Sequence, residues 1–239
     1  MRFSENSGWL SALIEGMPRQ ARIVAPGVAH HVTQRGTDRQ KVFYSRLDRT
    51  VYLDLLRTNC ELSGVKILAY CLMLNHIHLV CVPEAEDSLA VCLRRTHGRY
   101  SQYLNARRQR SGHLWQNRFY SCPLEERHLW TALRYVELNP VRAGLVASAE
   151  EYEYSSAAIH LGFKESDRLL DIVFWQESGA AESWAESLKI GEIEEERRRL
   201  RKATYGGMPL GSKEFVELCK WKGERIERDS EVFRPAPIF

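Results

Sequence analysis

The sequence lacks the features that mark several specialised classes of protein. No run of 18 or more apolar residues occurs in its 239 residues, which excludes a membrane-spanning helix of ordinary length. Low-complexity segments and internal repeats are also missing, which excludes the disordered and solenoid classes. The first 16 residues have neither the long apolar core nor the small-residue cleavage site of a secretory signal. We therefore expect a cytoplasmic protein without a membrane partner.

Paired cysteines are missing as well. The six cysteines are scattered, with no C-x-x-C spacing, and Cys71 and Cys81 stand inside apolar runs. In a cytoplasmic protein such cysteines are usually small buried side chains. We predict that they form neither disulfides nor a metal site.

Acidic residues are missing from one long stretch. Between Ser88 and Leu124 there is no Asp or Glu, while seven arginines lie there. Residues 1–149 carry 20 Lys or Arg against 12 Asp or Glu, whereas residues 150–239 carry 14 against 19. An uncompensated basic stretch attracts polyanions, so the first part of the chain is expected to bind nucleic acid. The alternative is a solvated helix face, although such faces usually mix both signs.

Hydrophobic spacing predicts an alternation of strands and helices. Strands are predicted over 28–34, 65–74, 77–82 and 115–122, and helices over 48–62, 88–110 and 125–138. Two strands joined by a tight connection are antiparallel. The order therefore predicts an α+β fold, an antiparallel sheet with helices packed on it in the split β-α-β ferredoxin-like arrangement.

The chain divides into three predicted parts. Residues 1–16 are a weak leader that need not belong to the fold, and residues 17–160 form the core domain. Residues 161–239 are predicted to be a helical C-terminal extension, since Glu194 and Arg198 have the spacing of a helical ion pair. Ser212 is predicted to cap a short helix there.

The sharpest motif is His76-Ile77-His78. On a strand, side chains alternate between faces, so both histidines project to one side and Ile77 to the other. Two imidazoles so placed can share one metal ion, a pattern that zinc hydrolases also use. The alternative is a pair of histidines that merely lie side by side on an exposed strand.

A second motif runs from Tyr135 to Pro140. On a helix, Tyr135 and Asn139 are four residues apart and share a face, while Glu137 points away. A tyrosine beside a metal site could act as a covalent nucleophile, and Asn139 could offer its amide oxygen to the same ion. Taken alone, a helical tyrosine is far more often a packing residue.

Together these features resemble the HUH endonucleases, and most closely the IS200-like and REP-associated tyrosine transposases. The resemblance covers roughly residues 17–160. Leu74 stands where the family has proline, and Met208 stands where it has arginine, which affects a contact of the tail rather than the core. The blocks that carry the resemblance are Met17 to Arg19, Arg35-Gly36, Ala69 to Leu79, Gly112 to Phe119, Tyr135 to Pro140 and Gly206 to Ser212.

The resemblance implies a metal-dependent enzyme that cleaves and rejoins single-stranded DNA. Tyr135 would attack a phosphodiester and leave a 5′-phosphotyrosine and a free 3′-hydroxyl. His76 and His78 would bind the ion, with Asn139 as the third ligand. The implied ion is Mg²⁺ or Mn²⁺, and on ligand chemistry two imidazoles leave Zn²⁺ open as well.

The implied partner is single-stranded or hairpin DNA, bound by a monomer or a homodimer. Phosphate contacts should make the binding strongly salt-dependent. Aromatic residues among the arginines could stack on unpaired bases, or belong to the core. The residues expected to bind DNA are Arg19, Arg22, Arg35, Arg94, Arg95, Arg99, Arg107, Arg108, Trp115 and Arg118.

Two other functions remain open at this point. One is a domesticated hairpin-binding protein that keeps the fold without turnover, against which the intact set of four site residues argues. The other is a metallohydrolase in which the histidine pair activates water and Tyr135 is structural.

Overall fold

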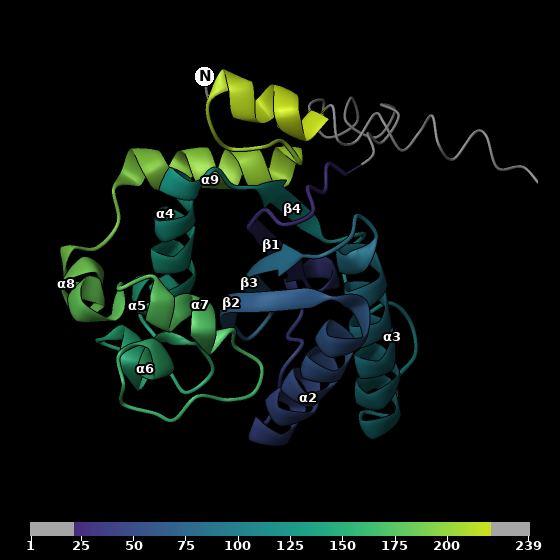
Figure 1. Ribbon diagram of the computed structural model, residues 1–239. Helices are drawn as coiled ribbons and strands as arrows, with labels where there is room; N and C mark the ends of the chain where they lie inside the picture. The colour runs from purple at the N-terminus through teal and green to yellow at the C-terminus, as the bar shows by residue number, and fades with distance from the viewer. Residues whose placement is uncertain (1–21, 221–239) are drawn as a thin grey trace, which may run out of the picture.

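The computed structural model describes residues 22–220, drawn in colour in Figure 1. The predicted leader and Arg19 lie outside the described residues. The strands are β1 (His30–Arg35), β2 (Val65–Leu72), β3 (His76–Pro83) and β4 (Tyr120–Pro123). The helices are α2 (Arg46–Ser63), α3 (Ser88–Arg107), α4 (Glu126–Glu137), α5 (Asn139–Arg142), α6 (Ala157–His160), α7 (Ile172–Glu177), α8 (Ala181–Ile190) and α9 (Glu194–Gly206), with 3-10 turns η1 (Thr37–Arg39) and η2 (Ala149–Glu151).

The strands form one sheet in the order β2-β3-β1-β4. Every pair of neighbours is antiparallel, which confirms the predicted α+β class. Because β1 and β3 are the central strands, their backbones are hydrogen-bonded on both sides. Side chains on these two strands are therefore held in fixed positions across the middle of the sheet.

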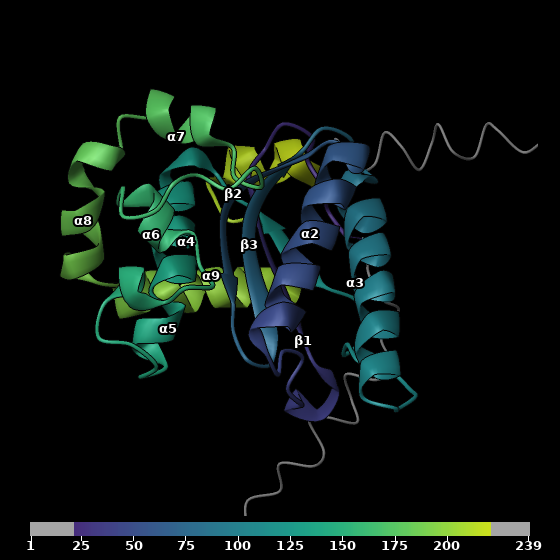
Figure 2. The same cartoon turned by 90° about the horizontal axis from the view of Figure 1, so that it is seen from below.

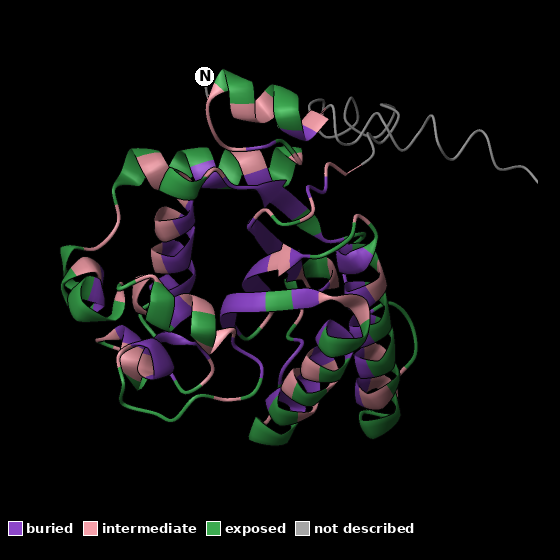
Figure 3. Cartoon of the chain, in the orientation of Figure 1, coloured by how far each residue is buried: buried purple, intermediate pink, exposed green. Residues whose placement is uncertain are grey.

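Helices cover both faces of the sheet. Figure 2 shows the sheet between α2 and α3 on one side and α4 and α9 on the other. Alternation along β3 supplies both cores, since Ile77 and Leu79 belong to the cluster under α2 and α3, and Val80 belongs to the cluster under α4. Most of the sheet is accordingly coloured as buried in Figure 3.

Local sequence explains where α2 begins and ends. The Ser45 hydroxyl accepts from the Asp48 amide, and the Asp48 carboxylate accepts from the Ser45 amide, which forms a capping box. Gly64 ends the helix in the left-handed conformation, at φ 61°, and leads directly into β2. The predicted helix over 48–62 is thus confirmed and two residues longer at its start.

Two predicted elements are wrong in extent. The strand predicted over 115–122 is limited to β4, because Asn117 adopts a left-handed φ of 54° that interrupts the extended chain. Trp115 forms only an isolated bridge with Gly36. The helix predicted over 88–110 ends at Arg107, before Gln109 takes a positive φ of 49°.

The segments after residue 150 pack on the sheet, where they pair with the β2 edge and with the end of β4. On the β2 edge, Cys71 bridges to Ser155 and Ile67 to Leu170, and on the β4 side Leu124 bridges to Leu210. The Ser212 hydroxyl accepts from the Phe215 amide, as expected of a helix cap. No helix among residues 22–220 is both long and apolar enough to cross a bilayer.

Candidate functional site

The central strand β3 positions the histidine pair. His78 is paired with Thr33 of β1 and with Cys71 of β2, so its backbone is fixed from both sides. His76 and His78 lie on the α4 face of the sheet, as their spacing predicts, with ring centroids 5.0 Å apart and planes at 85°. His78 is buried, whereas His76 is partly exposed at the end of the strand.

The helix α4 brings Tyr135 against this pair. The Tyr135 ring meets His78 edge to face, with centroids 5.4 Å apart. Only 6% of Tyr135 is exposed, and burial raises the pKa of its phenol, although the positive charges of Arg142 and Arg201 act in the opposite direction. Because its pKa is raised, the phenol stays protonated at neutral pH. No hydrogen bond engages its hydroxyl within residues 22–220, so its oxygen is not committed to another group.

Arg142 is a cation at this site that the sequence interpretation missed. Its guanidinium carbon lies 4.5 Å from the centre of the Tyr135 ring. It also donates to the Asn139 side-chain oxygen and pairs with Glu192. The Asn139 amide nitrogen donates to the Tyr135 carbonyl at 3.0 Å. Asn139 is therefore linked to Tyr135 through the backbone and Arg142, and no hydrogen bond joins it to either histidine in the described chain.

Glu137 anchors the opposite side of α4. It points away from Tyr135, as predicted, and is completely buried. Its carboxylate accepts hydrogen bonds from Ser156 Oγ at 2.5 Å, His160 Nδ1 at 2.6 Å and Trp184 Nε1 at 2.8 Å. Because these donors come from the chain that follows α4, they tie the tyrosine helix to that chain.

A third histidine, His31, completes the cluster on β1. Its Nε2 lies 3.0 Å from Nδ1 of His78, and its ring meets Tyr135 edge to face at 5.5 Å between centroids. The sequence interpretation missed His31. Its place in the cluster follows from the register of the sheet, which puts Thr33, on the same strand face as His31, opposite His78.

The donor set fits a divalent ion whose other ligands are oxygens. Burial, and then the nearby Arg35, lowers the pKa of His76 to about 4; burial, and then His76, also lowers that of His78. Both imidazoles are therefore neutral, which is the form that binds metals. No group of three or more His, Cys, Asp or Glu side chains in residues 22–220 is arranged to hold a metal. Asn139, a phosphate or water would have to supply the oxygens.

The remaining nitrogen of His76 is available for such an ion. The Asn75 amide nitrogen donates to the Arg39 carbonyl at 3.0 Å, which turns its oxygen toward His76. That oxygen lies 2.7 Å from His76 Nδ1 and can only accept. Nδ1 therefore carries the proton, and Nε2 of His76 has a free lone pair.

The predicted DNA-binding arginines separate into two groups. Arg94, Arg95 and Arg99 are exposed on α3, and none has an ion-pair partner in the described chain. Arg107 is instead bound to Asp48 at 2.9 Å. Arg108 lies over the Tyr44 ring at 3.7 Å, which occupies one side of its guanidinium. Arg94, Arg95 and Arg99 are thus free to meet phosphates, and so is Arg118, which is exposed and has no ion-pair partner in residues 22–220.

A hollow of about 590 Å³ collects several of the predicted residues beside α3. Arg22 lies over the Phe119 ring at 3.8 Å, and burial, followed by the charge of Arg118, lowers its pKa to about 10. Gln34 lines the same hollow, and the next residue, Arg35, pairs with His76 across the sheet. The hollow and the His76 end of the cluster therefore lie at the same end of β1, on opposite faces.

Trp115 lines this hollow but is mostly committed to the core. It is 9% exposed and packs against His97, with centroids 4.4 Å apart. Tyr100 is fully buried, and its hydroxyl donates to the Val42 carbonyl at 2.6 Å. Of these two aromatic residues, only the rim of Trp115 is therefore available for stacking on unpaired bases.

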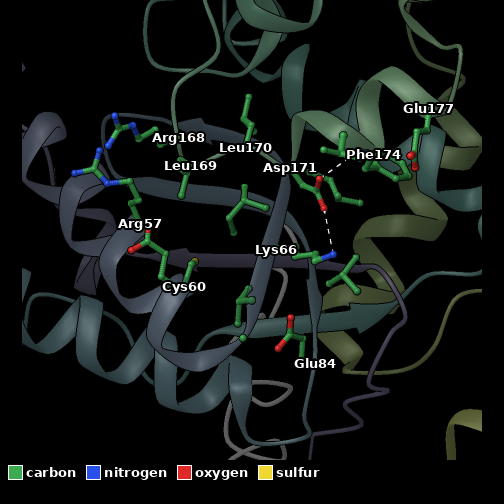
Figure 4. Close-up of a pocket in the computed structure, with 17 residues that line it drawn as sticks. Arg57, Cys60, Lys66, Glu84, Arg168, Leu169, Leu170, Asp171, Phe174 and Glu177 are labelled. Atoms are coloured by element: carbon green, nitrogen blue, oxygen red, sulfur yellow. Dashed lines mark hydrogen bonds and ion pairs between the residues drawn. The ribbon is translucent and has the colours of Figure 1, made fainter.

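A separate hollow of about 680 Å³ lies by the β2 edge, between α2 and α7 (Figure 4). Lys66 and Asp171 form an ion pair across it, at 3.7 Å. None of the residues that line it belongs to the histidine and tyrosine cluster. Its mixed charges do not favour a polyanion, so we do not assign it to the site.

The comparisons with known proteins agree with one another. Residues 26–139 match the family model described as "Transposase IS200 like". A protein of Haemophilus influenzae with the provisional name REP-associated tyrosine transposase is 27% identical over 111 residues, 42% of this chain and 63% of that relative. The match thus spans less than two thirds of the relative. The structure of a REP-associated tyrosine transposase bound to a REP hairpin has 15% identity and a TM-score of 0.54, over 64% of this chain and 90% of that one, which shows the fold.

Proposed function

We propose that this chain, whose residues 26–139 match the IS200-like transposase family, cuts and rejoins single-stranded DNA beside a hairpin through a covalent bond to Tyr135. The observation that carries the proposal is the convergence of Tyr135 and His78, from a helix and a central strand, with ring centroids 5.4 Å apart. The hairpin is proposed by analogy with the solved relative, whose DNA is a REP hairpin. The cytoplasm is the compartment we expect for this activity.

The proposed reaction is a transesterification. The Tyr135 oxygen forms a bond to the scissile phosphorus while the bond from phosphorus to the 3′ oxygen breaks. The phenol loses a proton and the departing 3′ oxygen gains one. The product is a 5′-phosphotyrosine, and attack by another 3′-hydroxyl reverses the step and rejoins the strand without an external energy source.

The side chains around Tyr135 have separate roles in this reaction. His76, His78 and Asn139 would hold Mg²⁺ or Mn²⁺, which when bound neutralises charge on the phosphate oxygens. Arg142, against the Tyr135 ring, favours the ionised phenol and attracts the phosphate. Arg201, exposed on α9, adds to the same positive field.

We also propose a path for the DNA. The free arginines of α3 and the hollow lined by Arg22 and Arg118 would hold the backbone on one face of the sheet. The strand would then pass the end of β1 at Arg35 and reach Tyr135 on the other face. Phosphate contacts along such a path supply affinity without reading sequence.

The proposal is tested with purified protein, Mn²⁺ or Mg²⁺ and a labelled single strand that carries a hairpin. We expect a protein–DNA adduct that survives denaturation, is absent in Tyr135→Phe, and is retained in Tyr154→Phe, whose ring lies under Arg49 instead. Cleavage without an adduct would favour the metallohydrolase. Binding without cleavage would favour the domesticated hairpin-binding protein.

His76→Ala separates chemistry from binding. Cleavage should be abolished, while affinity for the hairpin changes little, because phosphate contacts supply most of it. Parallel loss of both would count against the site as described.

A further inference from the structure

A chain of buried hydrogen bonds runs from α9 to the histidine pair. His31 Nδ1 lies 2.8 Å from the Thr204 hydroxyl, and His31 Nε2 lies 3.0 Å from His78 Nδ1. The Thr204 hydroxyl itself lies 2.8 Å from the Leu200 carbonyl oxygen, one turn earlier on α9. Thr204, His31 and His78 are at most 3% exposed, so water does not compete for these bonds.

The two imidazoles meet edge to edge. Their planes differ by 7°, and their centroids are 5.2 Å apart, much farther than the 3.0 Å between the facing nitrogens. Rings stacked face to face would not bring one nitrogen of each so much closer than the centroids. The contact is therefore a hydrogen bond that lies in the plane of both rings.

The Leu200 carbonyl oxygen can only accept, and we assign the single proton of the Thr204 hydroxyl to that bond. With its proton used there, the hydroxyl accepts the proton of His31 Nδ1. A neutral imidazole carries one proton, which leaves His31 Nε2 as an acceptor. His78 Nδ1 must then donate to it, and the single proton of neutral His78 is used there. Cys122, 3.2 Å from the Thr204 oxygen, can donate to its second lone pair without changing this order.

We propose that His31 and Thr204 are positioning residues that fix the tautomer of His78 and present its Nε2 lone pair to a metal ion. This inference rests on the proposed function only where it assigns the Nε2 lone pair of His78 to a metal ion. The arrangement gives α9 a defined role, because a residue from the C-terminal extension sets the proton position on a strand in the centre of the sheet. His76 reaches the same tautomer separately, through Asn75.

Removing the Thr204 hydroxyl should release this control. In Thr204→Val the volume is nearly kept, but His31 Nδ1 loses its acceptor. The reversed order, with His31 Nε2 donating to His78 Nδ1, then moves the unpaired N–H from the sealed Nδ1 of His31 to the side of His78 that a metal ion would occupy, where a water molecule can accept it. That order moves the proton of His78 to Nε2, where it blocks the metal. Loss of such a supporting partner typically lowers metal affinity by about 10–100-fold.

The first test measures the tautomers directly in the metal-free protein, by two-dimensional ¹⁵N–¹H NMR of the histidine side chains. The native protein and Thr204→Ser, which keeps the hydroxyl, should show His31 and His78 protonated on Nδ1. Thr204→Val should show protonation on Nε2 of both. Thr58→Val removes a similar hydroxyl-to-carbonyl bond at an exposed position of α2 and should leave the signals of both histidines unchanged. Protonation of His78 on Nε2 in the native protein would overturn the proposal.

The second test titrates the same four proteins with Mn²⁺, monitored by the electron paramagnetic resonance signal of the free ion. Thr204→Val should bind about 10–100-fold more weakly, and Thr204→Ser and Thr58→Val should match the native protein. Equal affinity in all four would overturn the proposal. The outcomes are distinct from failure of the proposed function, because a protein that shows these tautomers and affinities but forms no DNA adduct would refute only the enzyme.

Discussion

Glu137 offers a measure of how firmly the tyrosine helix is held. Glu137→Ala would leave three buried donors, on Ser156, His160 and Trp184, without their acceptor. Each unsatisfied buried donor costs about 1–3 kcal/mol, and the costs are not additive because neighbours relax. We expect a loss of about 3–5 kcal/mol in the free energy of unfolding, which is more than one unsatisfied donor costs and less than the upper sum for three.

The assay is urea unfolding followed by tryptophan fluorescence, to which Trp184 and Trp175 in this region contribute. The matched control is Glu126→Ala, on the same helix but exposed and without an ion-pair partner in the described chain. Glu126 lies in the first turn, where its interaction with the helix dipole contributes at most about 1 kcal/mol to the free energy of unfolding. If Glu137→Ala lost no more than Glu126→Ala, the three hydrogen bonds would not hold the helix, and the reasoning would be refuted.

The other predictions concern DNA affinity, acid stability and thiol reactivity. The double variant Arg94→Ala and Arg99→Ala should weaken binding to all sequences and reduce the slope of log affinity against log salt by about 1 for every phosphate that is no longer neutralised; an unchanged slope would move the DNA path elsewhere. Burial raises the pKa of Asp48, but hydrogen bonds from Tyr44, Ser45 and Tyr103 outweigh this and keep the pKa below its usual value. Because the folded pKa is depressed, the stabilisation is complete above the unfolded pKa of about 3.9 and is lost as pH falls through the folded value, so Asp48→Asn should flatten the fall in urea midpoint below about pH 5. The prediction would be contradicted if the urea midpoints of Asp48→Asn and the native protein fell in parallel as the pH is lowered. All six thiols are buried, and burial raises the pKa of Cys122 to about 12, so a thiol reagent should react only after unfolding; rapid reaction of the native protein would disagree.

Much of the fold could be predicted from sequence because its signals are local. Alternation along 76–82 and helical spacing in 88–110 each depend on neighbours in the chain, and together they gave the antiparallel sheet with its helices. The failures are local too, but subtler. The left-handed conformations of Asn117 and Gln109 end a strand and a helix early. Residues other than glycine adopt a positive φ uncommonly, so the sequence does not predict it at these two positions.

The site was predicted only in part, because the rest depends on register and on distant contacts. The histidine pair and Tyr135 carry a motif, and the structure brings them together. His31 joins them because Thr33, on the same face of its strand, lies opposite His78 in the sheet. Thr204 is 173 residues away from His31 in sequence. The spacing of hydrophobic residues along the sequence cannot predict a contact between residues so far apart.

The basic stretch shows the same limitation in another form. The sequence treats its arginines as one set, whereas the fold divides them. Arg107 forms an ion pair with Asp48, and the other arginines of α3 lie on the opposite side of the sheet from Tyr135. Helix geometry, rather than charge count, decides which of them a polyanion can reach.

The segments that pair with the β2 edge and with the end of β4 restrict how this protein can assemble. An open edge strand is a template on which a second chain can add its own strand. Here the β2 edge meets Ser155 and Leu170, and the β4 edge is followed by a bridge to Leu210. A continuous sheet shared by two copies would first require these segments to be displaced, so a homodimer would form more readily through helical surfaces. A chain shortened at residue 160 would uncover part of both edges and is expected to aggregate.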